Sequence, residues 1–276
     1  MKRIVVPVDF SKYSENAFLS AVKIAAKGDA SITCVNAINS SLDWKNLPEK
    51  EKSKHQEILD KLAEAKDKLN AFIVDHKVSG NPVEGVVEVG VPSNVIVDTA
   101  YKQAADLVII GAYGAGHEEG KFIGSTMQKV LRHADCPVLA VKKVVDGRAM
   151  KKMVFAALFN EESKPAFIRM KPLIKLAGAS VHFLYINTPS KFTDSLKAEE
   201  LMRTYAAGQE DLVIHKHVFS HDEAEKGIVA FAESQKAGLI GLASNTRKTN
   251  STYQIGVTET VLYKTEVPVL SVKFER

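Results

Sequence analysis

The first half of the chain alternates short apolar runs with longer stretches whose apolar residues recur at helical spacing. The apolar runs predict strands at Ile4–Val8, Ser31–Ile38, Val83–Val89, Leu107–Ile110 and Val138–Lys142. The intervening stretches predict helices near Tyr13–Lys27, at Pro48–His76, from Pro92 to about Ala105, and at Ser125–His133. Strands that alternate with helices pair in parallel through right-handed crossovers, and the helices then cover both faces of the sheet.

The second half repeats the first half in the same order. KRIVVPVDFS at 2–11 resembles KMVFAALFN at 152–160, and ASITCVNAI at 30–38 resembles ASVHFLYIN at 179–187. ADLVIIG at 105–111 resembles AGLIGLA at 237–243, and CPVLAVK at 136–142 resembles VPVLSVK at 267–273. The segment Val144–Lys151 between them is polar and contains a glycine, as connections do. We therefore expect an α/β protein with two tandem doubly wound, Rossmann-like domains, 1–144 and 151–276, each with a mostly parallel five-stranded sheet.

Composition excludes several classes of protein. The net charge is +4, and no block of like charges forms the basic stripe that nucleic-acid binding requires. No apolar run approaches the roughly 18 residues of a membrane helix, and Asp9 interrupts the short N-terminal run too early for a secretion signal. The two cysteines, Cys34 and Cys136, indicate no disulfide framework. We expect a cytoplasmic protein that binds neither nucleic acid nor membrane.

The segment GAYGAGHEEGKFIGST at 111–126 carries the clearest chemical signal. Gly111, Gly114, Gly124 and Ser125 have the spacing G-x2-G-x9-G-S, between a predicted strand and a predicted helix. Glycine lets the backbone approach an anion closely, and the free N–H groups at the start of a helix attract negative charge. The spacing therefore predicts a site for a phosphate group.

Three predicted strands end near residues that suit a ligand. Asp9, Val35 and Gly111 lie at or near the carboxyl ends of separate strands, where doubly wound sheets bind ligands. Structural alternatives remain for each residue type. Asp9 alone is compatible with capping the next helix, the glycines with plain turns, and Ser125 with a helix N-cap. Val35 alone reads as an ordinary strand residue.

V-P-V-D at 6–9, the glycine spacing at 111–125 and KVLRHADCPVLAV at 129–141 together resemble the universal stress protein family. The whole chain is similar to a tandem form with two such domains. The resemblance implies a stress-response or regulatory protein that binds ATP, or ADP or AMP, with Mg²⁺ as a possible companion. It implies that Asp9 contacts the adenosine, that the backbone of Val35 recognises adenine, and that 124–126 hold the phosphates. The implied site residues are Pro7, Asp9, Val35, Gly111, Gly114, Gly124, Ser125 and Thr126.

The loop within the glycine segment offers further charged groups. Lys121 could neutralise a phosphate, and Glu118 or Glu119 could help to hold Mg²⁺ through water. The alternative is a solvated lid without contacts to the ligand.

The second half has lost most of the motif. In the alignment above, Ala243, Thr246, Gly256 and Val257 stand opposite Gly111, Gly114, Gly124 and Ser125, while Leu158 replaces Asp9 and Ala156 replaces Pro7. Cβ atoms at 243 and 246 obstruct a close approach of the backbone. We therefore expect one nucleotide per chain, in the first half. Two features stay open: Arg247 or Lys248 could hold another anion or be solvated, and His215, His217 and His221 could bind metal or mark an exposed strand.

The sequence leaves three functions to distinguish. No G-x4-G-K-[ST] loop or paired carboxylate motif is present, so a nucleotide-binding regulatory protein is favoured over an enzyme. The alternatives are a slow ATP hydrolase and an interaction scaffold that needs no nucleotide. The family resemblance also implies that the last strands, Val138–Lys142 and Val269–Lys273, pair in an intramolecular pseudo-dimer. A homodimer is a further expectation, and the sequence identifies no protein partner.

Overall fold

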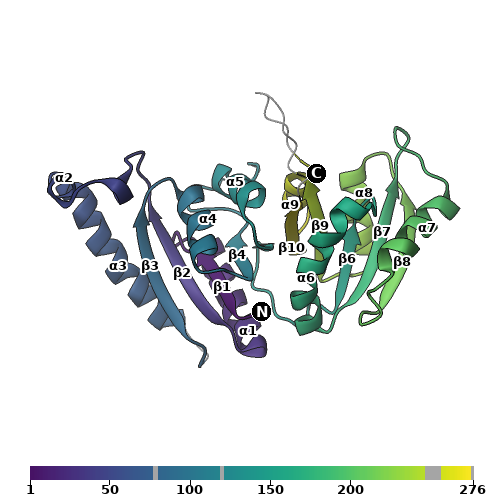
Figure 1. Cartoon of the computed structure of the whole chain (residues 1–276), viewed down its shortest axis with the longest axis horizontal. Coiled ribbons are helices and arrows are strands. Elements are labelled where there is room, and N and C mark those ends of the chain that lie inside the picture. The colour runs from purple at the N-terminus through teal and green to yellow at the C-terminus, as the bar shows by residue number, and fades with distance from the viewer. Residues whose placement is uncertain (77–79, 119–120, 246–255, 275–276) are drawn as a thin grey trace. The chain divides into compact units, whose positions relative to one another are not determined.

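The computed structural model describes residues 1–76, 80–118, 121–245 and 256–274. It divides into two compact units. Unit 1 contains 1–136 and 141–144, and unit 2 contains 137–140 and 145–276. Strands and helices alternate along each unit (Figure 1), which confirms the predicted α/β class.

Unit 1 has its strands in the order β3-β2-β1-β4, and every neighbouring pair among them is parallel. The strands are β1 (Arg3–Pro7), β2 (Ser31–Ile38), β3 (Val83–Val89) and β4 (Leu107–Gly111). The helices are α1 (Lys12–Gly28), η1 (Trp44–Asn46), α2 (Glu49–Lys52), α3 (Gln56–His76), α4 (Pro92–Lys102) and α5 (Ser125–His133). The chain runs outward from β1 through β2 to β3, and then returns to the other side of β1 as β4. The switch point of this doubly wound sheet therefore lies between β1 and β4.

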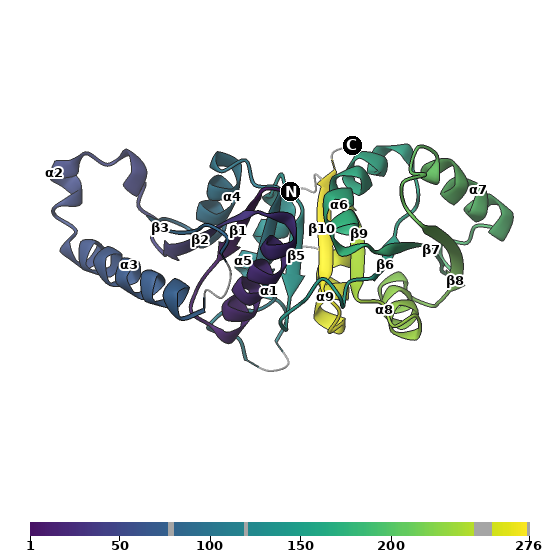
Figure 2. The same cartoon turned by 90° about the horizontal axis from the view of Figure 1, so that it is seen from below.

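Unit 2 has the corresponding parallel order, β10-β9-β6-β7-β8. The strands are β6 (Lys152–Ala156), β7 (Ser180–Asn187), β8 (Ile214–Ser220), β9 (Leu239–Asn245) and β10 (Val269–Phe274). The helices are η2 (Glu161–Ser163), α6 (Lys164–Ala177), α7 (Ser195–Ala206), α8 (Ala224–Ser234) and α9 (Val257–Lys264). Figure 2 shows α6 and α7 on one face of this sheet and α8 and α9 on the other. Residues 138–140 of β5 (Val138–Val141), which are grouped with unit 2, pair antiparallel with β10.

The two repeats match residue by residue at their first turns. Arg3 pairs with Ser31 as Lys152 pairs with Ser180. Phe10 has φ 62° and Phe159 has φ 54°. A bulky residue in the left-handed region is strained, so this shared conformation marks the same position of the two turns. Leu158 therefore occupies the position of Asp9.

Two helix boundaries differ from the predictions. The stretch Pro48–His76 is not one helix, because the non-helical residues 53–55, with a turn at 53–54, separate α2 from α3. Helix α4 ends at Lys102 rather than near Ala105. Ala104 has φ 43°, a left-handed conformation that no helix can continue through.

The core of unit 2 contains a cluster of aromatic side chains between the sheet, α6 and α7. Phe155, Phe167, Phe183 and Tyr205 are fully buried, and their ring centroids lie 4.8–6.1 Å apart. Aromatic rings at such distances gain stability beyond the burial of their area. The cluster therefore anchors both helices to this face of the sheet.

Among the described residues, no helix has both the length and the apolar character that crossing a membrane requires.

Candidate functional site

A cavity of about 470 Å³ opens at the carboxyl ends of β1, β2 and β4 in unit 1. Its position is the switch point of the sheet, and its volume falls in the usual range for small-molecule sites. The structure brings together all of the site residues predicted from the sequence. The cavity is lined by Pro7, Asp9, Val35, Gly111, Gly114, Gly124, Ser125 and Thr126, among others.

Asp9 fastens the glycine loop to the end of β1. One carboxylate oxygen, Oδ2, accepts a hydrogen bond of 2.8 Å from the backbone N–H of Ala115. The other, Oδ1, accepts from the N–H and the hydroxyl of Ser11, at 3.1 and 2.5 Å. The N-cap of α1 is Ser11, whose hydroxyl accepts from the N–H of Ser14. Asp9 thus supports the cap rather than forming it, and its exposed carboxylate retains room for another donor.

Gly111 and Gly114 are required by close contacts within unit 1. A Cβ atom at Gly111 would lie 2.6 Å from the carbonyl carbon of Tyr13 and 2.7 Å from its oxygen. A Cβ atom at Gly114 would lie 2.9 Å from Oδ2 of Asp9. The first glycine lets α1 pack against the end of β4, and the second lets Asp9 reach the loop.

Gly124 has no such internal requirement. A Cβ atom there would meet nothing within 4 Å, and its φ of −64° is open to any residue. Gly124 lines the cavity and is the N-cap of α5, which has no side-chain cap. The first N–H groups of α5, together with the hydroxyls of Ser125 and Thr126, therefore supply hydrogen-bond donors at one end of the cavity.

The backbone of Val35 is engaged within the sheet. Its carbonyl accepts a hydrogen bond of 2.8 Å from the N–H of Val8, and its side chain is buried. The pairing of β1 with β2 ends at Pro7 and Val35. Two residues further along β2, Ala37 also lines the cavity, and its backbone points to the same side of the strand as that of Val35. Ala37 is therefore better placed than Val35 to offer backbone groups, a distinction that only the end of β1 reveals.

Sequence reasoning missed an aromatic group beside the glycine loop. Tyr113 and His117 are stacked with ring centroids 3.6 Å apart, and Tyr13 packs edge-on against both rings. Nζ of Lys142 lies 5.5 Å from the centroid of the Tyr113 ring. Both Tyr113 and His117 line the cavity. Tyr113 and His117 are four residues apart in the sequence, a spacing that allows two side chains to meet. The glycines between them indicated a loop and gave no reason to expect that contact.

The charged residues of the loop are partly engaged with each other. Nζ of Lys121 lies 2.6 Å from Oε2 of Glu118, and both side chains are largely exposed. Both residues line the cavity. An exposed ion pair of this kind contributes little to stability, so either partner can exchange it for another contact at small cost. Glu119 lies outside the described residues.

Unit 2 has different side chains at the corresponding positions. Leu158 stands in place of Asp9, and Val257 stands in place of Ser125 at the start of α9, with exposed fractions of 44% and 42%. Apolar side chains here provide neither an acceptor for hydroxyl groups nor a donor for phosphate. The loop residues Thr246, Arg247 and Lys248 lie outside the described residues.

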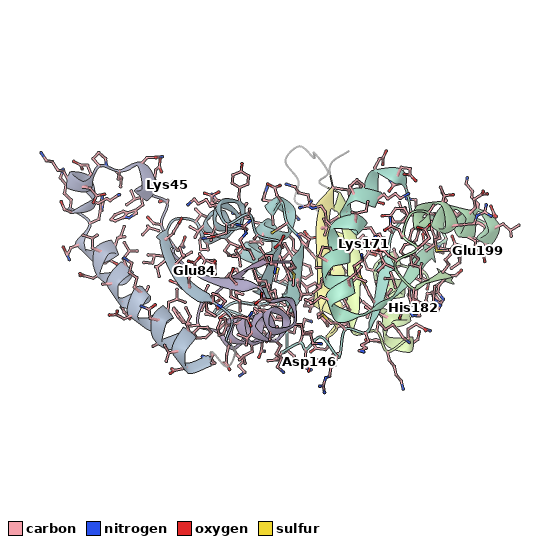
Figure 3. All side chains as sticks on the ribbon, turned by 60° about the horizontal axis from the view of Figure 1, so that its bottom comes forward. Lys45, Glu84, Asp146, Lys171, His182 and Glu199 are labelled. Carbon is pink, nitrogen blue, oxygen red and sulfur yellow. The ribbon has the colours of Figure 1, made fainter. Side chains whose placement is uncertain are left out.

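Three histidines form a cluster on the α8 face of the unit 2 sheet. His182 of β7 lies beside His215 of β8 in the sheet, and its Nδ1 is 2.9 Å from Nε2 of His217 (His182 is labelled in Figure 3). His215 and His217 share one face of the strand, as the sequence predicted. The His217 ring also packs against Phe231 of α8. Although these three rings lie close together, they are not arranged to hold a metal ion. The same is true of every other group of three or more His, Cys, Asp or Glu side chains in the part of the chain that the structure describes.

We expect unit 2 to lose stability as the pH falls from 6.5 toward 4. Burial, with the charges of His217, His215 and Lys152, lowers the pKa of His182 from 6.5 to about 4, and burial also lowers the pKa of His217. Below pH 6.5 the unfolded chain therefore takes up protons that the folded chain does not. The free energy of unfolding of unit 2 is highest above pH 6.5 and falls as the pH decreases toward 4. At about 1.4 kcal/mol per pKa unit, discounted for partial solvent exposure, the loss is about 2 kcal/mol.

Urea unfolding of the full chain at pH 7, 6, 5 and 4 measures this loss. In the His182→Thr variant, which carries the residue of the corresponding position Thr33, we expect a flatter dependence on pH. The same pH dependence in both proteins would contradict the assignment to His182.

Comparison with known proteins places the chain in a family. The model of the universal stress protein family matches residues 1–142 of the 276. A universal stress protein of Methanocaldococcus jannaschii is 32% identical over 150 residues, which covers 51% of this chain and 82% of that protein. A relative from Staphylococcus aureus strain USA300 is 35% identical over 148 residues, which covers 51% of this chain and 84% of the relative.

Solved structures share the fold over the whole length. The crystal structure of a universal stress protein from Archaeoglobus fulgidus has a TM-score of 0.69 at 21% identity, covering 98% of each chain. A structure from Pseudomonas aeruginosa has a TM-score of 0.63 at 18% identity, covering 99% of this chain and 94% of that one. The family match spans both ends of the cavity, from Pro7 to Thr126, and more than half of the sequence. The chain therefore belongs to the universal stress protein family.

Proposed function

We propose that the domain 1–144 binds one adenine nucleotide, preferably ATP, and that the chain uses this binding in a regulatory, stress-response role. Gly124 carries this proposal. The fold itself gives no reason for glycine there, because a Cβ atom would meet nothing within 4 Å. A ligand that must approach the start of α5 closely does give a reason. The domain 151–276 is, in this proposal, the counterpart that has lost the site.

The donors at the start of α5 favour a phosphate. A phosphate at a helix N-terminus accepts from free N–H groups and is attracted by the helix dipole. Ser125 and Thr126 add hydroxyl donors, and Lys121 adds a positive charge. The cavity continues from there toward β2, so a chain of phosphates would lead to the nucleoside end. Mg²⁺, where it accompanies ATP, would be bound largely through the phosphates.

The opposite end of the cavity suits a nucleoside. The carboxylate of Asp9 can accept from ribose hydroxyls while it keeps its hydrogen bonds to Ser11 and Ala115. The backbone of Ala37 can pair with the polar edge of a base. Apolar side chains of Pro7, Ile96 and Ile110 supply a surface for the flat ring. Val35 also lines the cavity, and its backbone contact with adenine stays a prediction.

Regulation by binding, rather than turnover, is the role that we propose. The sequence offers no established arrangement of nucleophile and base, and His117 in the cavity is stacked on Tyr113. The intramolecular pseudo-dimer and a homodimer of whole chains also stay predictions.

Calorimetric titration of the full chain with ATP and MgCl₂ tests the site. We expect one nucleotide per chain, and an affinity at least tenfold lower in Gly124→Val, a loss of about 1.4 kcal/mol. The valine side chain would stand where the phosphate approaches. Melting without ligand should change only slightly, because the added Cβ meets open space and valine at an N-cap costs about 1 kcal/mol. Gly80→Val is the matched control, since Gly80 also has no close neighbours but lies outside the cavity.

Three outcomes would contradict the proposal. Absence of binding at millimolar ATP would favour a scaffold that needs no nucleotide. Unchanged affinity in Gly124→Val would show that the phosphates bind elsewhere. Two nucleotides per chain would show that the second domain has kept a site.

A further inference from the structure

Helix α9 of unit 2 corresponds to helix α5 of unit 1. Gly256 is the N-cap of α9 and Gly124 is the N-cap of α5, and both glycines have extended backbone with φ of −88° and −64°. Counting from these caps, the third helical residue is Met127 in α5 and Glu259 in α9. Both of these side chains are buried, with 3% and 5% of their surface exposed. At this position after the N-cap, α9 thus has a buried carboxylate where α5 has an apolar side chain.

Glu259 folds back over the start of its own helix. A Cβ atom added to Gly256 would collide with Oε2 of Glu259 and lie 3.4 Å from the carboxyl carbon. The same addition at Gly124 meets open space. The region beside the N-cap, which is open cavity in unit 1, is therefore filled by a carboxylate in unit 2.

A carboxylate at this position interacts with the helix as a phosphate does. The N-terminal turn carries a partial positive charge, and a glutamate three residues after the N-cap can satisfy it from within the chain, as in a capping box. A second anion at this position would have to displace the carboxylate, which already occupies the space beside the N-cap. Unit 2 also lacks the second polar group of the unit 1 cavity, because Leu158 stands at the position of the Asp9 carboxylate.

We propose that Glu259 is a built-in anion that takes the place of a bound phosphate in unit 2. It stabilises the start of α9 without a ligand, and it excludes free phosphate and the phosphates of nucleotides from that position. Glu259 is then a specificity-determining residue that restricts binding to unit 1. The comparison with phosphate rests on the proposed nucleotide site of unit 1.

Backbone amide NMR of the full chain, titrated with inorganic phosphate, tests exclusion in both units at once. In the wild type we expect the amides of 125–128 to shift and those of 257–260 to stay unchanged. In Glu259→Met, which carries the residue of the corresponding position Met127, we expect the amides of 257–260 to shift as well. Shifts at 257–260 in the wild type, or none in the variant, would overturn the proposal. Absence of shifts at 125–128 would count against the unit 1 site alone.

Melting of Glu259→Gln tests the stabilising role separately, because glutamine keeps the shape and removes the charge. We expect the melting temperature to fall by about 2–4 °C relative to Glu199→Gln, the effect of one favourable charge at a helix start in a unit of this size. Glu199 of α7 is exposed (Figure 3), so its substitution controls for the loss of one negative charge. Equal melting temperatures in the two variants would overturn the stabilising role.

Discussion

Replacing Gly111 with alanine is expected to destabilise unit 1 by about 3 kcal/mol and to weaken nucleotide binding with it. The added Cβ would lie 2.6–2.8 Å from backbone and side-chain atoms of Tyr13, which belong to the first turn of α1. Backbone cannot yield as a flexible side chain does, so either α1 or the glycine loop must move. Overpacking of this kind typically costs 1–3 kcal/mol, and the rigid contact places Gly111 at the upper end.

Gly124→Ala is the matched control for this substitution. Both variants add one methyl group to a glycine of the same motif, but the methyl group at 124 meets open space. Urea unfolding followed by the fluorescence of Trp44, the single tryptophan of the chain, reports on unit 1. Equal stability of the two variants would show that α1 adapts to Gly111→Ala easily. Calorimetry with ATP on both proteins then separates a displaced loop from a blocked phosphate position.

Replacing Tyr205 with alanine is expected to destabilise unit 2 by about 3–5 kcal/mol. Tyr205 is fully buried, and its ring lies within 5.3–6.1 Å of the rings of Phe155, Phe159, Phe167 and Phe183. Removal of the ring leaves a cavity between α7 and the sheet that the neighbouring rings can fill only in part. Burial raises the pKa of Tyr205 to about 12, so the phenol stays neutral over the range in which the protein is studied.

Tyr205→Phe keeps the ring and separates packing from hydrogen bonding. This variant removes only the hydroxyl group that lies 3.3 Å from Oγ of Ser163, so we expect a loss of about 1 kcal/mol. Hydrogen exchange at the amides of α7 measures both variants within unit 2. Trp44 fluorescence of unit 1 serves as the reference that should not change. A loss in Tyr205→Ala no larger than that in Tyr205→Phe would contradict the assigned role of the ring.

Local patterns predicted much of the fold because they record local physics. Helix Ser125–His133 and strands Ser31–Ile38 and Val83–Val89 have the predicted bounds, since each is bordered by residues that end or begin regular structure. The break between α2 and α3 was missed, because the apolar spacing continues through it. The stop of α4 depends on the backbone angle of Ala104, which composition does not reveal.

Some residues of the candidate site could likewise be predicted from the sequence, and others could not. The glycine spacing and Asp9 could be found in the sequence, because few other residues permit a close approach of the backbone or accept several hydrogen bonds at the end of a strand. Ala37 could not, since its exposure to the cavity depends on where the neighbouring strand β1 ends. The inward fold of Glu259 was also hidden, because a glutamate in the first turn of a helix is usually at the surface.

The hydrogen bonds of Asp9 have a consequence for the energetics of recognition. They join the loop at Ala115 to the turn after β1 in the chain itself, without any ligand. The conformational entropy of that loop is therefore lost when the protein folds and not when it meets its ligand. Preorganisation of this kind favours rapid association, and it leaves most of the free energy of each contact available as affinity.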